Sequence, residues 1–458
     1  MSTPPIQVCY QELADALHAQ PTPGLIQRLE LLRALAAALR DHEEPILQAL
    51  KDDLHKSNSE AFFCELDQVH RAIAHARRHL ARWMRRQRGR MASIYPGAFP
   101  YQLAEPYGLV LIMAPWNYPV DLTLAPLVDA IAAGNRVLLA PSPKAAHTHA
   151  ALFEMLEQAL PHEYVRCIAP GAPDRDLLLT LHFDYVLYTG GASYGRQVAL
   201  AAAQHLTPCT LELGGKSPVI VGPAANVDSS ARRIVWGKCL NAGQTCVAPD
   251  YVLVAEGLAQ PLIAALIREF VSAFGPEPEA SPDYPRIITQ AATQRLQQLL
   301  VGQPVVYGGD TKVAARYVSP TLVYAPALDA PLMQEEIFGP ILPIVPYRTL
   351  AEALSIVRAR PKPLALYHFG SRSEFQKILS CTSSGGACHN DVVIHITHPA
   401  LPFGGVGASG YGRYHGRAGF LTFSNLRSVL NAHYMPDMRL RHAPYAPLAR
   451  IKRLLRWV

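Results

Sequence analysis

Between residues 108 and 206 the chain alternates short apolar runs with longer runs of helical periodicity. The apolar runs cover 108–114, 137–140, 165–168 and 185–188, and the helical runs cover 122–133, 145–160 and 195–206. Strands that alternate with helices of ten or more residues form βαβ units, which pair their strands in parallel. The pattern therefore predicts a doubly wound α/β sheet, in which ligands bind at the carboxyl ends of the strands.

A second α/β series follows Gly214-Gly215, with strands expected at 219–221 and 251–254 and helices at 232–240 and 260–274. Before residue 90 the sequence is typical of helices, because leucines recur at spacings of three and four. They are Leu29, Leu32, Leu35 and Leu39. Since 458 residues exceed a single ordinary core, we expect at least two domains.

The formal net charge of +6 is modest for this length and gives no reason to expect a nucleic-acid partner. The segment 71–90 carries eight arginines, but Ile73, Ala76, Leu80 and Trp83 recur within it at helical spacing. A solvated or subunit-facing helix surface is therefore favoured over a polyanion site. The basic tail, 450–458, is too short and too charged to span a bilayer. A surface tail is favoured there over peripheral membrane contact, which stays open.

No run of about 18 uncharged apolar residues occurs, so no transmembrane segment is expected. Met1-Ser2-Thr3-Pro4-Pro5 lacks the basic start and apolar block of a secretory signal. The eight cysteines form no CxxC pair, and none of the 18 histidines lies in an HExxH pattern. We therefore expect a cytoplasmic protein with reduced thiols and no bound metal.

Three residues stand in settings that suit covalent catalysis. Cys246 ends Gly243-Gln244-Thr245-Cys246, Glu212 ends an apolar strand and enters a glycine loop, and Asn117 follows another apolar strand. They are candidates for a nucleophile, a base that activates water and a donor to an oxyanion. In isolation each has a more common structural role: a buried thiol, an ion-pair partner or a turn residue.

Five stretches of the chain occur together in one order: Pro115 to Pro119, Thr210 to Pro218, Asn241 to Cys246, Glu335 to Pro340 and Pro402 to Gly407. In these stretches the chain resembles the aldehyde dehydrogenases, most of all the class 3 branch, over roughly residues 20 to 435. Together the five stretches favour the catalytic interpretation of Cys246, Glu212 and Asn117 over the structural one.

The resemblance implies a Rossmann-type cofactor domain over 1–210, interrupted near 85–105 by a bridging segment. It further implies an α/β catalytic domain over 211–420 and a bridging, oligomerisation element with the tail over 421–458. Class 3 relatives use this element to form a dimer, so we expect a homodimer.

The implied reaction is NAD- or NADP-dependent oxidation of a hydrophobic aldehyde, aliphatic or aromatic, to its carboxylic acid. Cys246 would form a thiohemiacetal and then a thioester, which water activated by Glu212 would hydrolyse, while Asn117 and the Cys246 N–H would hold the alkoxide. A free thiol has a pKa of about 8.5, so some feature of the site must supply thiolate. Tyr118 and His415 are candidates for the border of the substrate funnel, with core packing or surface roles as alternatives. Lys216 is expected to pair structurally rather than react.

Gly190, Gly191 and Gly195 follow a predicted strand and open a helix, as a phosphate-binding turn does. They match the position of the family's own glycine turn, although glycines there can also serve only strand-to-helix packing. Glu336 and Phe338 match the motif that positions the nicotinamide ribose in relatives. Trp116 is a further candidate for contact with the cofactor.

One departure concerns the adenosine ribose. Relatives usually read Lys-Pro-Ser-Glu, where Lys and Glu hold the ribose hydroxyls, but this chain reads Ala140-Pro141-Ser142-Pro143 followed by Lys144. Pro143 cannot repel a 2′-phosphate, and Ser142, Lys144 or Arg196 could contact one. The sequence therefore predicts that NADP is accepted at least as well as NAD.

Two other functions are alternatives. A coenzyme-A-acylating dehydrogenase releases its thioester to a thiol and generally lacks the hydrolytic Glu, so Glu212 argues against it. A non-catalytic scaffold on an enzyme fold is favoured only by the missing ribose ligands, and the retention of Cys246 and Asn117 argues against it.

Overall fold

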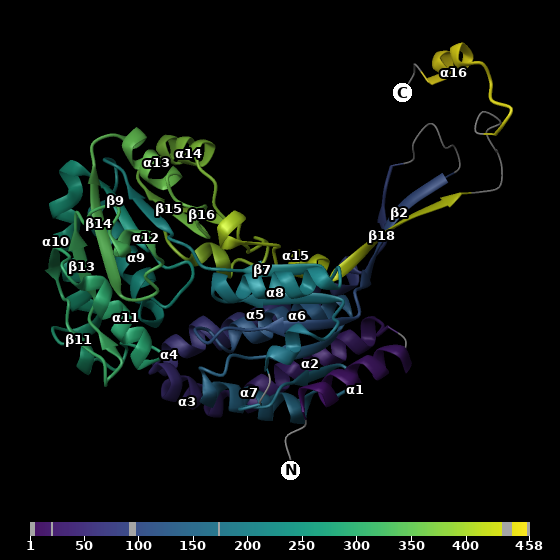
Figure 1. The fold of residues 1–458 in the computed structure, drawn as a ribbon, viewed down its shortest axis with the longest axis horizontal. Coiled ribbons are helices and arrows are strands. Elements are labelled where there is room, and N and C mark those ends of the chain that lie inside the picture. Colours follow the sequence, from purple (N-terminus) through teal and green to yellow (C-terminus); the bar gives the residue numbers. More distant parts are fainter. Residues whose placement is uncertain (1–4, 20–21, 91–97, 173–174, 433–441, 456–458) are drawn as a thin grey trace.

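The computed structural model describes residues 5–19, 22–90, 98–172, 175–432 and 442–455. The chain forms two α/β lobes and a β arm that projects away from them (Figure 1). Residues 91–97 of the expected bridging segment, residues 456–458 of the basic tail and residues 1–4 of the N-terminus lie outside the described residues.

The first lobe is built on a six-stranded sheet with the strand order β17-β7-β6-β3-β4-β5. Its strands are β3 (Leu109–Met113), β4 (Arg136–Ala140), β5 (Val165–Cys167), β6 (Tyr185–Thr189), β7 (Cys209–Glu212) and β17 (Gly410–Tyr411). Its helices are α1 (Ile6–Ala19), α2 (Leu25–Asp41), α3 (Glu43–Leu54), α4 (Asn58–Ala61), α5 (Asp67–Trp83), α6 (Asp121–Ala133), α7 (Ala146–Ala159) and α8 (Ala192–Gln204). All pairs are parallel except β17 with β7.

The sheet is covered on both faces because successive side chains of a strand point to opposite sides. On β3, Val110 and Ile112 pack with α2, α5, α6 and α7, whereas Leu111 packs with α1 and α8. On α5 the predicted apolar residues are buried and Arg71, Arg77, Arg78 and Arg82 are exposed on the helix surface, whereas Arg85, Arg86, Arg88 and Arg90 lie beyond the end of the helix. The doubly wound architecture is thus confirmed.

The second lobe contains a seven-stranded sheet with the order β10-β13-β14-β9-β8-β15-β16. Its strands are β8 (Pro218–Val221), β9 (Tyr251–Ala255), β10 (Val305–Tyr307), β13 (Thr321–Tyr324), β14 (Ile341–Tyr347), β15 (Ala365–Phe369) and β16 (Gly386–His389), with a separate pair β11 (Thr311–Lys312) and β12 (Tyr317–Val318). Its helices are α9 (Val227–Cys239), α10 (Ala259–Phe274), α11 (Gln290–Leu300), α12 (Pro331–Gln334), α13 (Leu350–Arg358) and α14 (Arg372–Cys381).

Helices cover this sheet on both faces as well, with α9 and α10 on one side and α13 and α14 on the other. The start of α9 differs from the predicted 232: the helix begins at Val227, because the Asn226 side chain accepts a hydrogen bond from Ser229 N–H at 2.9 Å and caps it. A polar cap carries no apolar periodicity, so the hydrophobic pattern could not locate this start.

One segment of the described residues, Glu256–Ala280, is long and apolar enough to cross a membrane by length and composition. It contains α10, whose Leu262, Leu266 and Phe270 are fully buried in the core of the second lobe. One face of α10 therefore packs into that core.

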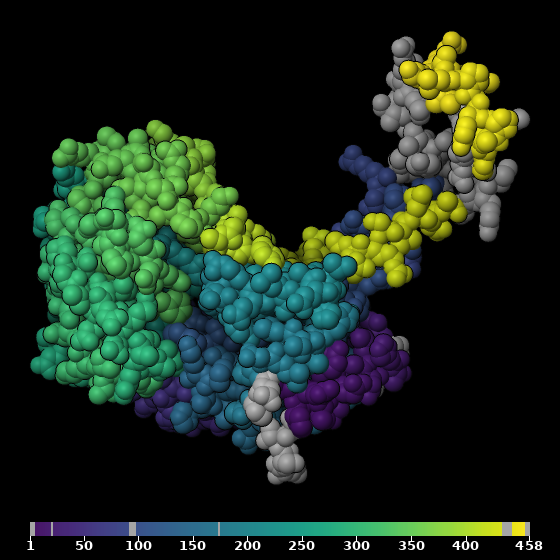
Figure 2. Space-filling view, in the orientation of Figure 1, coloured from purple at the N-terminus to yellow at the C-terminus, as the bar shows by residue number. Residues whose placement is uncertain are grey.

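The arm is a three-stranded sheet of β1 (Gln87–Arg88), β2 (Ala98–Pro106) and β18 (Ser424–Ala432). It stands clear of both lobes, with α16 (Leu448–Leu455) beyond its end (Figures 1 and 2). Between the second lobe and the arm the chain returns to the first lobe, where β17 joins its sheet and α15 (Gly416–Thr422) packs on α5 and α6. The division at residues 210 and 420 stays a prediction.

A buried ion pair ties the N-terminal helices to the loop after β3. Lys56 Nζ and Glu65 Oε1 lie 2.5 Å apart, and both side chains are fully buried. Lys56 also donates to Asn117 O at 3.0 Å and lies 4.1 Å over the ring of Tyr118. Glu65 accepts a hydrogen bond from Val120 N–H at 2.8 Å. The pair therefore sets the path of residues 117–120.

Replacing one member of this pair should destabilise the protein. We expect Lys56→Met to lower the free energy of unfolding by about 3–5 kcal/mol, because the Glu65 carboxylate would stay buried without its cation. Chemical denaturation measures the change. The control is Lys51→Met, at an exposed position of α3, whose free energy of unfolding should stay within about 0.5 kcal/mol of that of the unmodified protein. Lys56→Met/Glu65→Leu should recover part of the loss. A loss below about 1 kcal/mol in the single variant would contradict the assigned role.

Candidate active site

Four predicted site segments lie at one edge of the first sheet. Because β3, β4, β6 and β7 run in parallel, their carboxyl ends meet at the same edge. β3 leads to Trp116 and Asn117, β4 leads to Ser142, β6 leads to Gly190, and β7 ends at Glu212. Gly190 N–H donates to Glu212 O at 3.0 Å and joins the ends of β6 and β7.

Cys246 comes from the second lobe, shortly after a strained turn. The turn is η3 (Leu240–Gly243), in which Asn241 and Ala242 have φ of 51° and Gly243 has φ of 77°. Such angles are uncommon for residues other than glycine. At Gly243 a Cβ would also collide with the carbonyl of Gly339, so glycine is required there. Strain of this kind is kept where the surroundings hold it.

Hydrogen bonds hold this turn against the first lobe. Asn117 Nδ2 donates to Gln244 O at 3.0 Å, and Asn241 Nδ2 donates to Asn117 O at 2.7 Å. Asn241 N–H donates to Glu60 Oε1 at 2.7 Å, and Gln244 Oε1 accepts a hydrogen bond from Ile288 N–H at 2.9 Å. The segment that carries Cys246 is thereby fixed beside the edge where Glu212 lies.

The Cys246 thiol is half-buried and its surroundings oppose ionisation. Burial raises the pKa of Cys246 to about 12, and the nearby carboxyls of Glu336 and Glu212 raise it further. Its own N–H and that of Val247 favour the thiolate but do not outweigh these effects. At neutral pH the thiol is therefore protonated, so a base or a cation must help to form the thiolate.

Glu212 is 2% exposed, and neither carboxylate oxygen makes a hydrogen bond of normal geometry with a described residue. Burial raises the pKa of Glu212 well above its usual range, and the charge of Arg413 lowers it only in part. A buried carboxyl without a partner is costly and rare in a purely structural role. It is suited to exchange a proton with a molecule that enters the site.

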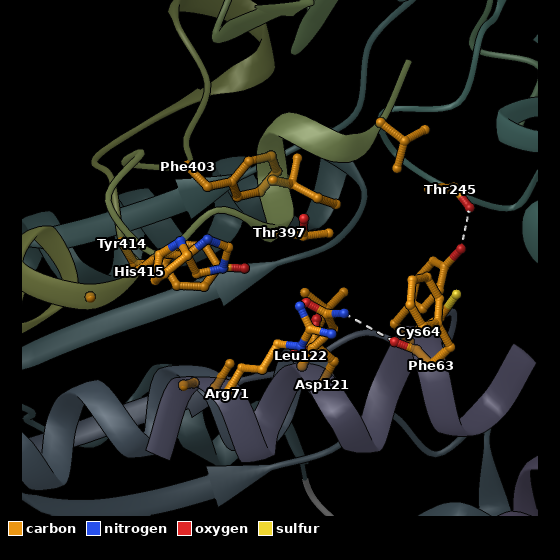
Figure 3. A pocket seen from close by; sticks show the side chains of 18 of the residues that line it. Phe63, Cys64, Arg71, Asp121, Leu122, Thr245, Thr397, Phe403, Tyr414 and His415 are labelled. Atoms are coloured by element: carbon orange, nitrogen blue, oxygen red, sulfur yellow. Dashed lines mark hydrogen bonds between the residues drawn. The ribbon is translucent and has the colours of Figure 1, made fainter. Parts of the chain in front are cut away.

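Cys246 lies in the wall of a pocket with about 1120 Å³ of empty space, its open mouth included. Both residues expected at the border of the funnel, Tyr118 and His415, line this pocket. Tyr118 is held by a 2.6 Å hydrogen bond to Thr245 Oγ1, and the pocket lies between α5, α6 and the loops of the second lobe (Figure 3). Its lining is mainly apolar, including Phe63, Leu122, Ala125, Trp236, Leu240, Val393, Ile396 and Phe403.

Some residues of this wall were missed from the sequence: Cys64, Arg71, Asp121 and Tyr414. The first two lie in helical segments that match no motif. Asp121 carried one signal, since it is an acidic residue inside the apolar run that begins α6. Burial and the neighbouring Glu65 raise the pKa of Asp121 to about 8.

Glu336, Phe338 and Trp116 are the predicted candidates for contact with the nicotinamide part of the cofactor or its surroundings. The Glu336 carboxyl lies against Gly214, where a Cβ would collide with it, and burial raises its pKa to about 8. The rings of Phe338 and Trp116 meet edge to face with centroids 5.5 Å apart. Trp116 follows β3 of the first sheet, and the Glu336 carboxyl is near enough to Cys246 to raise the pKa of its thiol.

Lys216 holds this segment in place. Its Nζ pairs with Asp250 and donates to the carbonyls of Leu332 at 2.9 Å and Glu335 at 2.6 Å. Asp250 in turn accepts a hydrogen bond from Ile337 N–H at 3.0 Å. The expectation that Lys216 pairs structurally is therefore confirmed.

The glycine turn can accommodate a dinucleotide phosphate. Helix α8 begins after Gly191 without a side-chain cap, so N–H groups of its first turn lack a side-chain partner. A Cβ on Gly191 would meet nothing within 4 Å, whereas Gly190 and Gly195 lie against Tyr188 and Leu213. Gly190 and Gly195 thus serve close packing, and Gly191 borders open space.

Two further observations concern the cofactor side. Thr189 Oγ1, beside the turn, is buried without a hydrogen-bond partner among the described residues. At the end of β4, Ser142 Oγ accepts a hydrogen bond from Lys144 N–H at 3.3 Å, and the Lys144 side chain is exposed.

Within the described residues no group of three or more His, Cys, Asp or Glu is placed to hold a metal.

Comparison with known proteins agrees with this geometry. The aldehyde dehydrogenase family model matches residues 10–429. Aldehyde dehydrogenase family 3 member B1 of Mus musculus is 43% identical over 95% of this chain and 94% of that protein. The dimeric NADP-preferring aldehyde dehydrogenase of Canis lupus familiaris is 39% identical over 97% of this chain and 98% of that protein.

A solved structure is also similar, that of the substrate-bound AldH of Staphylococcus aureus. It has a TM-score of 0.94 and 38% identity, and covers 98% of this chain and 99% of that one. With the match along nearly its whole length, the chain belongs to the aldehyde dehydrogenase family and is an NAD(P)-dependent oxidoreductase that converts aldehydes to carboxylic acids.

Proposed function

We propose that Cys246, Glu212 and Asn117 carry out this oxidation. The Cys246 thiol gives its proton to solvent and its sulfur bonds to the aldehyde carbon, and the resulting alkoxide is held by the Asn117 amide and the Cys246 N–H. Loss of hydride from that carbon leaves a thioester. Glu212 takes a proton from water, and the resulting hydroxide attacks the thioester. The C–S bond then breaks, and Glu212 returns its proton to the leaving sulfur, so that the acid and the thiol are released. The observation that carries the proposal is the unpartnered, buried Glu212 carboxyl close to the Cys246 thiol.

Asn117 suits the oxyanion role because its amide carries two N–H groups and only one is used in the 3.0 Å hydrogen bond to Gln244 O. Its backbone is fixed by Lys56 and Asn241, so the amide can be held without reorganisation. Donors that are held in advance stabilise developing charge more than mobile ones.

The substrate we propose is a hydrophobic aldehyde, aliphatic or aromatic. The pocket that opens at Cys246 has mainly apolar walls. Burial also disfavours the charged form of its wall acid Asp129, because it raises the pKa of that carboxyl well above its usual range. An apolar chain therefore gains favourable free energy when it leaves water for this pocket.

Bound NAD or NADP supplies the hydride acceptor. We propose that Gly190, Gly191 and Gly195 shape its phosphate turn, that Glu336 holds the nicotinamide ribose, and that Trp116 and Phe338 flank it. Ser142 and Lys144 lie where the adenosine ribose ligands of relatives would be. The uncapped start of α8 supports phosphate binding there.

We further propose a homodimer in the cytoplasm, with the cofactor domain over 1–210, the catalytic domain over 211–420 and the arm as the dimer element. A relative's name calls it dimeric. All eight cysteines are free, as a reducing compartment requires. The arm leaves Leu430 on β18 56% exposed, which fits a surface that a second copy covers.

Cys246→Ala should abolish aldehyde oxidation and leave dinucleotide binding nearly intact, because the thiol forms the bond to substrate. Reduced-cofactor formation and a binding titration measure the two properties, with Cys381→Ala on α14 as the control. Substantial turnover by purified Cys246→Ala would exclude the assigned nucleophile.

Glu212→Gln should slow steady-state turnover by about 10²–10⁴-fold and impair the first-turnover burst less. In the unmodified enzyme deacylation should rise with pH through neutrality, since Glu212 acts as a base only when deprotonated and burial raises its pKa. In Glu212→Gln the steady-state rate should not rise with pH in this way. Equal damage to burst and steady state would instead assign Glu212 to the activation of Cys246.

NADP should bind comparably to NAD or more tightly, since Pro143 cannot repel a 2′-phosphate and the Lys144 ammonium is free in solvent to approach it. Lys144→Met should raise the dissociation constant of NADP by about threefold to tenfold and that of NAD only slightly. Dissociation constants for both dinucleotides measure this. NAD bound more than tenfold tighter than NADP, a gap of about 1.4 kcal/mol, would refute the prediction.

A further inference from the structure

One face of α5 carries basic side chains outward from the catalytic pocket. Arg71, His75, His79 and Arg82 are spaced by four, four and three residues, so they lie in one row along the helix. At 1.5 Å per residue the row is about 16 Å long. Arg71 and His75 line the pocket that contains Cys246, and His75, His79 and Arg82 line a second groove.

The two hollows adjoin, since His75, Pro399 and His415 line both. In Figure 3 Arg71 and His415 lie on the side of the pocket opposite Thr245, the neighbour of Cys246. The second groove therefore extends the pocket away from the nucleophile. Its far wall includes a further cation, Arg417.

The charge in this groove is not neutralised by carboxylates. Arg71 pairs with Asp67 at 2.7 Å, but Arg82 and Arg417 have no ion-pair partner among the described residues. No acidic residue lines the groove. The pKa of His75 is lowered by burial and then by His79, Arg78 and His398, and each of these neighbours is a cation or can become one.

The inner pocket differs, because its wall is mainly apolar and burial disfavours the charged form of its two acids. The pKa of Asp121 is raised to about 8, and that of Asp129 is raised well above its usual range. A molecule that extends from Cys246 to Arg82 therefore passes from a mainly apolar pocket, in which Arg71 is paired with Asp67, to a groove whose cations Arg82 and Arg417 have no ion-pair partner among the described residues.

We propose that the enzyme prefers long apolar aldehydes with an anionic group at the far end, a carboxylate or a phosphate, bound by Arg82 and Arg417 in this groove. The aldehyde lies at Cys246, the apolar chain fills the inner pocket, and the anion receives charge-assisted N–H hydrogen bonds from the guanidinium groups. This inference rests on the proposed function of Cys246. It adds a substrate class that an apolar pocket alone would not select.

The preference should be moderate, because these cations are exposed and solvent weakens each pair. We expect kcat/KM for an ω-oxo acid to exceed that of its neutral methyl ester by about fivefold at low ionic strength. Salt should reduce the ratio, because the Debye length shortens from about 30 Å at 0.01 M to about 8 Å at 0.15 M.

The test compares ω-oxododecanoate, its methyl ester and the matching ω-phosphate aldehyde. In the unmodified enzyme both anionic substrates should exceed the ester. Preference for only one of them would identify the anion, and an equal rate for all three would overturn the inference. If none is oxidised, the proposed function fails instead, so the two failures are distinguishable.

Variants locate the effect. Arg82→Gln/Arg417→Gln should bring the ratio of acid to ester close to one, and Arg82→Lys/Arg417→Lys should keep most of it. Both substrates are assayed with the same enzyme preparation. A partial loss of folded enzyme therefore lowers both values of kcat/KM equally and leaves their ratio unchanged. The control, Arg33→Gln/Arg77→Gln, removes the same charge from exposed positions outside both hollows and should keep the full ratio. An unchanged ratio in Arg82→Gln/Arg417→Gln would also overturn the inference.

Discussion

The buried pair of Lys56 and Glu65 is the interaction on which the geometry of the site depends. Lys56 holds the carbonyl of Asn117, and Glu65 holds the N–H of Val120, so two charges from the N-terminal helices set the loop after β3. That loop then fixes the turn before Cys246, because Asn117 donates to Gln244 O. The pair has to stay intact since either charge alone would be buried without compensation.

Because of this connection, the two lobes share one site. The first sheet supplies Glu212 at a strand end, and the second lobe supplies Cys246 on a turn with three consecutive positive φ values. Neither lobe carries both groups. Lys216 and Asp250 act in the same way for the Glu336 segment, so each reactive side chain is placed by contacts from another part of the chain.

Burial also gives the site its resting chemistry. Burial raises the pKa values of Cys246, Glu212 and Glu336, so the protonated forms of the thiol and of both carboxyls are favoured relative to free side chains. Such a site keeps a nucleophile unreactive until substrate and cofactor change its surroundings. The basic groove beyond the pocket lies on exposed helix surface, where charge costs little.

The sequence by itself determined the parallel sheets, most strand positions and the candidates Cys246, Glu212 and Asn117, because hydrophobic periodicity and short motifs are local properties. It did not locate the Asn226 cap, the Lys56–Glu65 pair or the pocket wall at Asp121 and Arg71. Those depend on which distant segments meet: Glu65 and Val120 are 55 residues apart, and Arg71 borders a pocket whose nucleophile is residue 246. Local pattern cannot encode such pairings, and only the packed fold decides which buried charges and cavities result.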